Sequence, residues 1–193
     1  MRVATWLAAA AVTAGLGAPG AGAEEIKGDF HETFDVSPGT VLKLHHGDGD
    51  VFFQVWDQDV IDVKVRYRAS FAMVGVGSKP AFGVEFTQEG NEVRVTGREK
   101  GVAMVGIFLA TSVSEYVYEI KVPEYIALES IGQDGDLNLA GLRGGPVRSR
   151  VDDGDIVLTD IQASRIDLEL DDGDFRGERL NGPLSVRSQD GNV

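Results

Sequence analysis

The strongest constraint on the fold is the tripeptide Asp-Gly-Asp, which returns at nearly constant intervals in the second half of the chain. It begins at Asp134, Asp153 and Asp172, and a related Asp-Gly-Asn begins at Asp190, so that the intervals are 19, 19 and 18 residues. A fixed period of this length is typical of stacked repeats, in which each unit buries its apolar face only against a neighbour. The sequence therefore predicts a stack of similar units.

The residues around each tripeptide also repeat, and they alternate between apolar and polar. An earlier copy, Asp48 to Asp50, is followed by Val51, Phe53 and Trp56 at the positions that hold apolar residues after the later copies. Alternation with a period of two is typical of half-buried strands. We predict an all-β chain, a β-solenoid-like stack of two-strand coils of about 19 residues. The inward residues predicted for the late coils are Leu137, Leu139, Leu142, Val147, Ser149, Val151, Ile156, Leu158, Ile161, Ile166, Leu168, Leu170, Phe175, Gly177, Leu180, Leu184, Val186, Ser188 and Val193.

The same alignment divides the chain into a leader and one domain. Residues 1–23 combine Arg2, an apolar run and a small-residue cleavage site, which is the pattern of a secretory signal peptide. Residues 24–193 are predicted to form a single β-repeat domain, long enough to bury a core. Within it we expect a first coil at 41–66, a hairpin-bearing insertion at 67–123 and late coils at 124–193. The return half of the first coil is assigned to Ile61, Val63 and Val65.

The insertion has alternating segments and two apolar loops. Phe82 to Phe86 and Val93 to Val95 predict a hairpin, and Tyr116 to Val122 predict a further strand that ends at Pro123. The two loops share the letters Ala-Met-Val-Gly. Two interpretations remain open, that they cover the core or that they form a surface for a lipid or protein partner, and burial is favoured because soluble chains rarely expose apolar patches. The candidate interaction residues are Met73, Val74, Met104, Val105 and Phe108.

Charge and cysteine content limit the partners and the chemistry. The chain carries a net charge of −13, and such a surface repels phosphate backbones, so nucleic acid is not an expected partner. The absence of cysteine excludes disulfides, thiol chemistry and a lipid-modified cysteine. In the predicted stack Arg148 lies beside Asp167, and Arg150, Glu169 and Arg187 form an alternating row, so opposite charges support one register.

The order of these elements resembles a known family. An early Gly49-Asp50-Val51 strand pair, a hairpin-bearing insertion, the strand Glu119 to Pro123 ending in Val-Pro, and serial Gly-Asp-hydrophobic coils are similar to bacterial exported β-repeat proteins labelled "putative adhesins". The resemblance covers about residues 40 to 193. It implies a β-solenoid-like fold and an adhesive or scaffolding role, and it brings no catalytic residues and no cofactor.

The aspartates are the sharpest candidates for a site. Stacked at about 4.8 Å per coil, they would form rows in which neighbouring charges repel by about 1 kcal/mol per pair even in water. One interpretation is structural: each aspartate accepts backbone N–H groups of its turn, and glycine supplies a left-handed conformation. The other is a divalent cation, possible Ca²⁺, between carboxylates of successive coils. The candidate metal ligands are Asp134, Asp136, Asp153, Asp155, Asp172 and Asp174.

Two further chemistries are weaker. A polysaccharide-acting enzyme could use the same carboxylates as an acid and a base, but equivalent turns give no carboxylate a distinct environment. His46 falls at a position that is apolar in the later coils, which favours burial over metal ligation because nothing supplies a third ligand.

The sequence thus predicts a non-enzymatic, exported protein of the periplasm, cell envelope or extracellular space. It has no transmembrane anchor in its mature form and acts by interaction, as an adhesin-like protein or a scaffold. The alternative is a module that binds a divalent cation or a glycan through the aspartate rows, and a polysaccharide-acting enzyme is third. The expected partner is an unidentified protein or an envelope polysaccharide. Because the sequence stops after opening a further coil, unpaired backbone at that edge also favours self-association.

Overall fold

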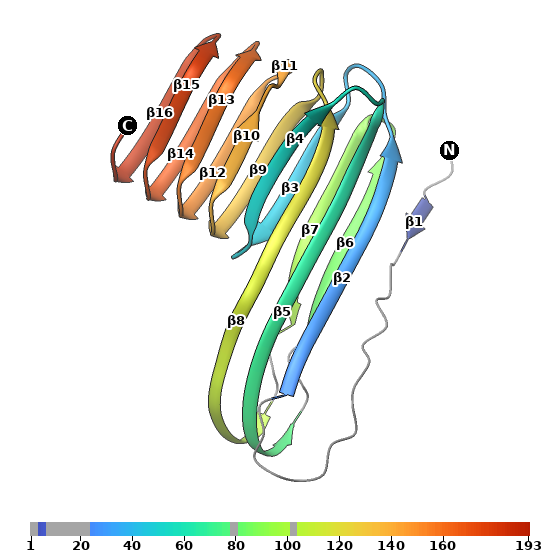
Figure 1. The fold of residues 1–193 in the computed structure, drawn as a ribbon, viewed down its shortest axis with the longest axis vertical. Coiled ribbons are helices and arrows are strands. Elements are labelled where there is room, and N and C mark those ends of the chain that lie inside the picture. Colours follow the sequence, from blue (N-terminus) through green and yellow to red (C-terminus); the bar gives the residue numbers. More distant parts are fainter. Residues whose placement is uncertain (1–3, 7–23, 78–80, 101–103) are drawn as a thin grey trace.

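The computed structural model describes residues 4–6, 24–77, 81–100 and 104–193, and every regular element among them is a β-strand. The strands form two sheets (Figure 1). Sheet A contains, in spatial order, β1 (Ala4–Trp6), β6 (Ala81–Glu89), β7 (Glu92–Lys100), β3 (Val41–Gly47), β9 (Ala127–Asp134), β12 (Val147–Asp153), β14 (Ile166–Asp172) and β16 (Leu184–Asp190). Sheet B contains β11 (Arg143–Gly144), β13 (Ile156–Ala163), β10 (Leu137–Ala140), β4 (Asp50–Trp56), β8 (Met104–Pro123), β5 (Val60–Gly77) and β2 (Glu24–Asp35), with β15 (Phe175–Asn181) beside β13.

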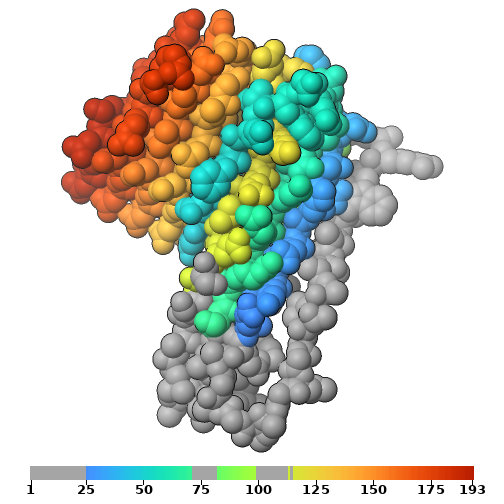
Figure 2. Space-filling model, in the orientation of Figure 1, coloured from blue at the N-terminus to red at the C-terminus, as the bar shows by residue number. Residues whose placement is uncertain are grey.

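The late coils confirm the predicted β-solenoid-like stack. Each coil places one strand in sheet A and the next in sheet B, and an Asp-Gly-Asp corner joins the two. Equivalent strands of successive coils pair in parallel and in the register predicted from the repeat, for example Leu137 with Ile156 and Val147 with Ile166. The coils lie side by side in Figure 1, from β9 to β16, and form one continuous ridged surface in Figure 2.

The core lies between the two sheets, where the alternating apolar residues meet. Leu137, Ile156 and Ile166 are fully buried, as the period-two pattern requires. The twelve predicted inward residues from Leu137 to Leu170 are buried, including Ser149. Those predicted from Phe175 onwards are only half-buried or are exposed, with Leu184 47% and Val193 77% exposed. Stacking therefore fills the space between the sheets with one row of side chains per position.

The return half of the first coil was predicted wrongly. Ile61, Val63 and Val65 are buried, but they belong to β5, which lies in sheet B and runs antiparallel to β8 and β2. The place beside β3 in sheet A is taken by β9 instead. Alternation shows that one face of a strand is buried but does not say in which sheet the strand lies, and this ambiguity is the reason for the error.

The two apolar segments predicted as loops are strands. β5 and β8 pair over almost their full length, so that Met73 lies opposite Phe108 and Val76 opposite Val105. Antiparallel pairing supplies hydrogen-bond partners for the backbone N–H and C=O groups of these segments, so they are stable as strands. The structure describes the backbone of these residues and not their side chains, so an interaction role for Met73, Val74, Met104, Val105 and Phe108 stays a prediction.

The predicted leader is described only in part. Ala4–Trp6 forms β1, which pairs antiparallel with β6, and residues 7–23 lie outside the described part of the chain. Removal of residues 1–23 therefore stays a prediction. Across the described ranges, no helix has both the length and the apolar character needed to cross a membrane.

Candidate functional site: the aspartate corners

The corners align the aspartates in two rows, as the repeat predicts. The first aspartates of the tripeptides follow one another across sheet A, because Asp134 pairs with Asp153, Asp153 with Asp172, and Asp172 with Asp190. All four side chains are exposed. The second aspartates form the other row: Asp50 starts β4, and Asp136, Asp155 and Asp174 directly precede β10, β13 and β15.

The second row is a hydrogen-bond ladder that runs from coil to coil. The backbone N–H of Asp155 donates to Oδ1 of Asp136 at 2.9 Å, and the N–H of Asp174 donates to Oδ1 of Asp155 at 2.9 Å. The ladder starts at Asp50, which accepts from Asp136, and ends at Asn192, which donates to Asp174. The carboxylates thus accept from the next coil and not from their own turn, which corrects the structural interpretation in one respect.

The central glycines Gly135, Gly154 and Gly173 each have two reasons to lack a side chain. Gly154 has a φ of +147°, in the region that favours glycine. A Cβ on Gly154 would also lie 2.3 Å from the carbonyl oxygen of Gly135, since the corners stack backbone on backbone. Close stacking at the corner, and not only turn geometry, therefore fixes glycine here.

The two rows differ in electrostatics. The pKa of Asp172, in the first row, is raised by desolvation and then by the charges of Asp153 and Asp190. Desolvation and the charge of Asp134 likewise raise the pKa of Asp48. In the second row the pKa of Asp174 is lowered, because the backbone N–H and the side-chain amide of Asn192 donate to its carboxylate. Repulsion between carboxylates thus acts on Asp48 and Asp172 in the first row, whereas hydrogen bonds stabilise the charge of Asp174 in the second.

The described residues include no cluster of side chains that could bind a metal ion. No three histidine, aspartate or glutamate side chains among them are placed to hold one ion. The six predicted ligands Asp134, Asp136, Asp153, Asp155, Asp172 and Asp174 are divided between the two rows, and Oδ1 of each second-row member among them already accepts a hydrogen bond. Calcium binding at the corners stays a prediction.

A buried polar cluster beside the first corner was only partly foreseen. His46 is fully buried, as predicted, and its Nδ1 donates to the carbonyl oxygen of Gly49 at 2.9 Å, whereas its Nε2 has no hydrogen-bond partner in the described structure. Burial lowers the pKa of His46 to about 4. The imidazole occupies the space over Gly132, where a Cβ would lie 2.0 Å from Cε1 of His46. Gly132 takes the position that holds Val151 and Leu170 in the later coils. This change from a large apolar residue to glycine is the feature of the sequence that could have indicated a buried neighbour at this position.

The outer face of sheet A carries the predicted charge rows. Arg148 lies 3.7 Å from Asp167 and 3.2 Å from Glu129. Glu169 lies between Arg150, at 4.0 Å, and Arg187, at 3.1 Å. These pairs are about half exposed, so each contributes at most about 1 kcal/mol, and together they favour the register that the apolar rows require.

Stacked coils that form two sheets and turn at repeated Asp-Gly-Asp corners define a β-solenoid-like repeat protein. The chain belongs to the Toastrack DUF4097 family, whose model matches residues 42–193. None of the curated proteins matches the chain significantly.

Three solved structures show limited similarity to the chain. The chain is 10% identical to a "putative cell adhesion protein" from Clostridium sporogenes ATCC 15579, with 86% of this chain and 98% of that chain covered and a TM-score of 0.48. A "putative lipid binding protein" from Parabacteroides distasonis ATCC 8503 is 13% identical over 84% of this chain and 74% of that chain, with a TM-score of 0.33. A "putative adhesin" from Parabacteroides merdae ATCC 43184 is 9% identical over 86% and 96%, with a TM-score of 0.22. Similarity at this level does not transfer function.

Proposed function

We propose that the chain is an exported, non-enzymatic interaction protein, and that the end of the stack formed by β15 and β16 binds a second copy. The observation that carries this proposal is that no other described strand covers the end formed by β15 and β16. Leu184 pairs with Ile166 in register, yet 47% of Leu184 is exposed whereas Ile166 is fully buried. Phe175 is likewise only partly buried, although its partner Ile156 is fully buried.

The backbone at the same end supports association. Within the described structure β16 pairs only with β14, and β15 only with β13. Each of these strands therefore presents one unpaired edge, which is a template for pairing with another strand. Two copies that meet end to end about a two-fold axis would pair these edges and cover the apolar side chains of both last coils.

A non-enzymatic role is supported by the corners. The carboxylates occur in repeated, exposed positions, and a catalytic pair needs two carboxylates held in different environments. The pKa of Asp172 is raised by desolvation and then by neighbouring aspartates, and the pKa of Asp174 is lowered by hydrogen bonds from Asn192, so the opposite shifts follow from the stacking of the coils. The proposed partners are therefore macromolecules of the envelope, either protein or polysaccharide.

The association is tested by light scattering on the purified chain over a hundredfold range of concentration. A mass that rises from monomer to dimer supports the proposal, and Leu184→Lys should shift the equilibrium strongly towards the monomer. Ile131→Lys is the matched control, because Ile131 is 49% exposed on the outer face of sheet A, away from the end of the stack. A monomer at every concentration, or equal loss of dimer in both variants, would contradict it.

A divalent cation at the first aspartate row is the second candidate. Desolvation raises the pKa values of Asp48 and Asp172, and repulsion adds to it, from Asp134 for Asp48 and from Asp153 and Asp190 for Asp172. A bound Ca²⁺ would relieve the repulsion. Calorimetric titration with Ca²⁺ tests this candidate, with Mg²⁺ as the comparison. Absence of heat, together with an unchanged melting temperature at millimolar Ca²⁺, would remove it.

A further inference from the structure

The outer faces of the two sheets differ in charge, and the repeat alone does not require this difference. On sheet A the outward positions of β12, β14 and β16 carry charged rows, such as Arg150, Glu169 and Arg187. On sheet B the outward positions that follow the corner aspartates are uncharged in β4, β10 and β13, whereas in β15 they hold Arg176 and Glu178. A chain with a net charge of −13 thus leaves a neutral area on one face of its stack.

This area, called the neutral patch, consists of two outward residues from each of three neighbouring strands. In register, Val157 of β13, Asn138 of β10 and Phe52 of β4 form one row, and Thr159, Ala140 and Gln54 form the next. Every polar side chain in this grid has only apolar neighbours along and across the strands, and every apolar side chain has only polar ones. The patch is therefore a checkerboard of hydrogen-bonding and apolar groups.

The side chains of the neutral patch are available for binding. Phe52 is 44% exposed, which makes it one of the few exposed large apolar residues in the described structure. Gln54, Asn138 and Thr159 are exposed or half-buried, and none of their side chains makes a hydrogen bond to another described residue. Their donors and acceptors therefore remain free for a ligand.

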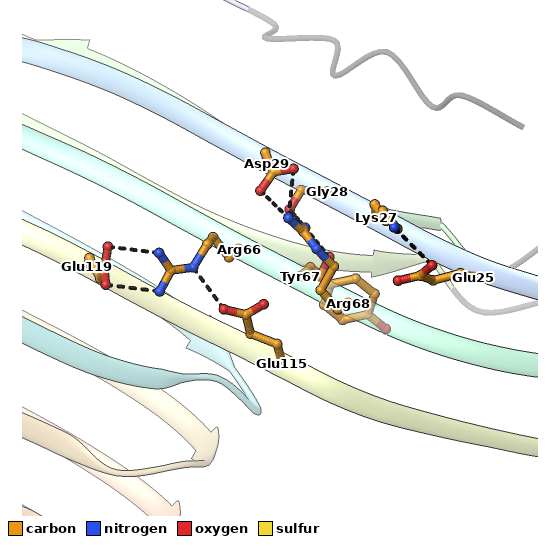
Figure 3. Close-up of polar contacts among 9 residues, drawn as sticks. All are labelled: Glu25, Lys27, Gly28, Asp29, Arg66, Tyr67, Arg68, Glu115 and Glu119. Atoms are coloured by element: carbon orange, nitrogen blue, oxygen red, sulfur yellow. Dashed lines mark hydrogen bonds and ion pairs between the residues drawn. The ribbon is translucent and has the colours of Figure 1, made fainter.

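Charged residues enclose the patch on both sides. Phe52 pairs with Glu119 and Gln54 with Lys121 on β8, while Val157 pairs with Arg176 and Thr159 with Glu178 on β15. Beyond β8 the outer face of sheet B is charged and paired: Arg66 binds Glu115 and Glu119, and Arg68 binds Asp29 (Figure 3).

The patch also has fixed boundaries along the strands. The corner carboxylates of Asp50, Asp136 and Asp155 lie at one end. At the other end the indole of Trp56 donates its N–H to the carbonyl oxygen of Val60, and the Lys121 ammonium lies 5.3 Å from its ring centroid. The neutral patch is therefore a bounded area and not the margin of a larger apolar surface.

The chemistry of the patch selects its ligand. With strands about 4.8 Å apart, its six residues cover an area far smaller than the 20 to 30 residues a side that a protein interface needs. The polar half of the grid disfavours a lipid chain, and the acidic row at its end repels anionic polymers. A neutral sugar presents apolar C–H faces together with hydroxyl edges, which match Phe52, Ala140 and Val157 on one hand and Gln54, Asn138 and Thr159 on the other.

We propose that the neutral patch is a binding site for neutral polysaccharide, with the Phe52 ring as the stacking surface and Gln54, Asn138 and Thr159 as the hydroxyl-binding groups. This proposal rests on the proposed interaction role, and it names one partner class at a site distinct from the β15 and β16 end. It also differs from a glycan site at the aspartate corners, since no carboxylate takes part.

The test is native gel electrophoresis of the full chain in gels that contain hydroxyethyl cellulose, dextran or galactomannan, with alginate as the anionic comparison. We expect at least one neutral polymer, and not alginate, to retard the protein. Phe52→Ala should weaken the retardation by about tenfold in apparent dissociation constant. The pair Gln54→Glu and Asn138→Asp, which keeps side-chain shape but adds charge, should abolish it.

Ile131→Ala is the matched control, because it removes an apolar residue of similar exposure from the outer face of sheet A. Retardation that persists in this variant and falls in Phe52→Ala supports the patch. The proposal is overturned if no neutral polymer retards the protein, or if both variants lose retardation equally. Self-association is measured separately by light scattering, so a failure of the patch leaves the dimer proposal standing, and a failure of the dimer leaves the patch.

Discussion

At the scale of single residues, the corners depend on glycines that recur with the repeat and on Gly132, which departs from it. The recurring glycine could be predicted from the sequence, because an Asp-Gly-Asp turn needs a left-handed residue. The close stacking of Gly154 on Gly135 could not, since it depends on how successive coils superimpose. The exception is Gly132, whose missing side chain makes room for the imidazole of His46.

The corner glycines provide the first prediction. Gly154→Ala should destabilise the fold by roughly 2 to 4 kcal/mol, because it adds both a strained backbone and a contact with a neighbouring carbonyl that cannot move away. Gly144→Ala is the matched control: Gly144 has a φ of +102°, but a Cβ there would meet no atom within 4 Å. Urea unfolding of both variants measures the difference. Equal losses would show that stacking adds nothing to the turn strain.

His46 provides the second prediction, a dependence of stability on pH. Its pKa is about 4 in the folded chain and about 6.5 when unfolded, so the unfolded chain binds more protons between these values. Above pH 6.5 His46 is neutral in both states and does not lower the free energy of unfolding. As the pH drops from 6.5 towards 4, protonation of His46 in the unfolded chain lowers the free energy of unfolding, by roughly 3 kcal/mol in all. Below pH 4 this contribution changes no further.

Denaturant unfolding at several pH values between 4 and 7 measures this slope. His46→Leu removes the titrating group, so the slope in this window should decrease by the amount assigned to His46. If the variant keeps the full slope, the carboxylates and not His46 are its source.

At the scale of elements, the strand pairing could be predicted where neighbouring coils have similar sequences, and it could not be predicted where they differ. The late coils have three matching copies, so the register of Ile156 and Ile166 followed from alignment. The first coil has one copy, and β5 and β9 both carry a period-two pattern that fits either sheet. Only tertiary pairing decides between them, which is why β5 was assigned to the wrong sheet. The neutral patch depends on the same kind of information, because only the pairing of β4 with β10 brings Phe52 beside Asn138.

The charged rows of sheet A provide the third prediction. Arg150→Glu should destabilise the stack modestly, because it places a third negative charge beside Glu169 and Asp171. The side chains of Arg150 and Glu169 are about half exposed, so their coupling in a double-mutant cycle with Glu169→Arg should be only about 0.2 to 1 kcal/mol. A coupling near zero would mean that apolar alternation alone sets the register.

At the scale of the whole molecule, the stack couples each coil mainly to its neighbours, so stability should vary along it. Coils flanked on both sides bury their apolar rows completely, whereas the last coil is covered on one side only. The described structure thus has a stable centre, formed by β9, β12 and β14 in sheet A, and a weaker end at β15 and β16. This gradient places the proposed self-association site at the part of the stack with most to gain from a partner.

Hydrogen exchange measures this gradient and its relation to assembly in one experiment. In dilute protein we expect amides of β12 and β14 to exchange slowest and those of β15 and β16 fastest, because the last coil opens without breaking the others. At high concentration the protection of β16 should rise selectively, since association pairs its free edge. Leu184→Lys should remove this rise and leave the protection of β12 unchanged, while Ile131→Lys should preserve both. Uniform protection along the stack would contradict nearest-neighbour coupling, and a gradient that is independent of concentration would contradict assembly through this end.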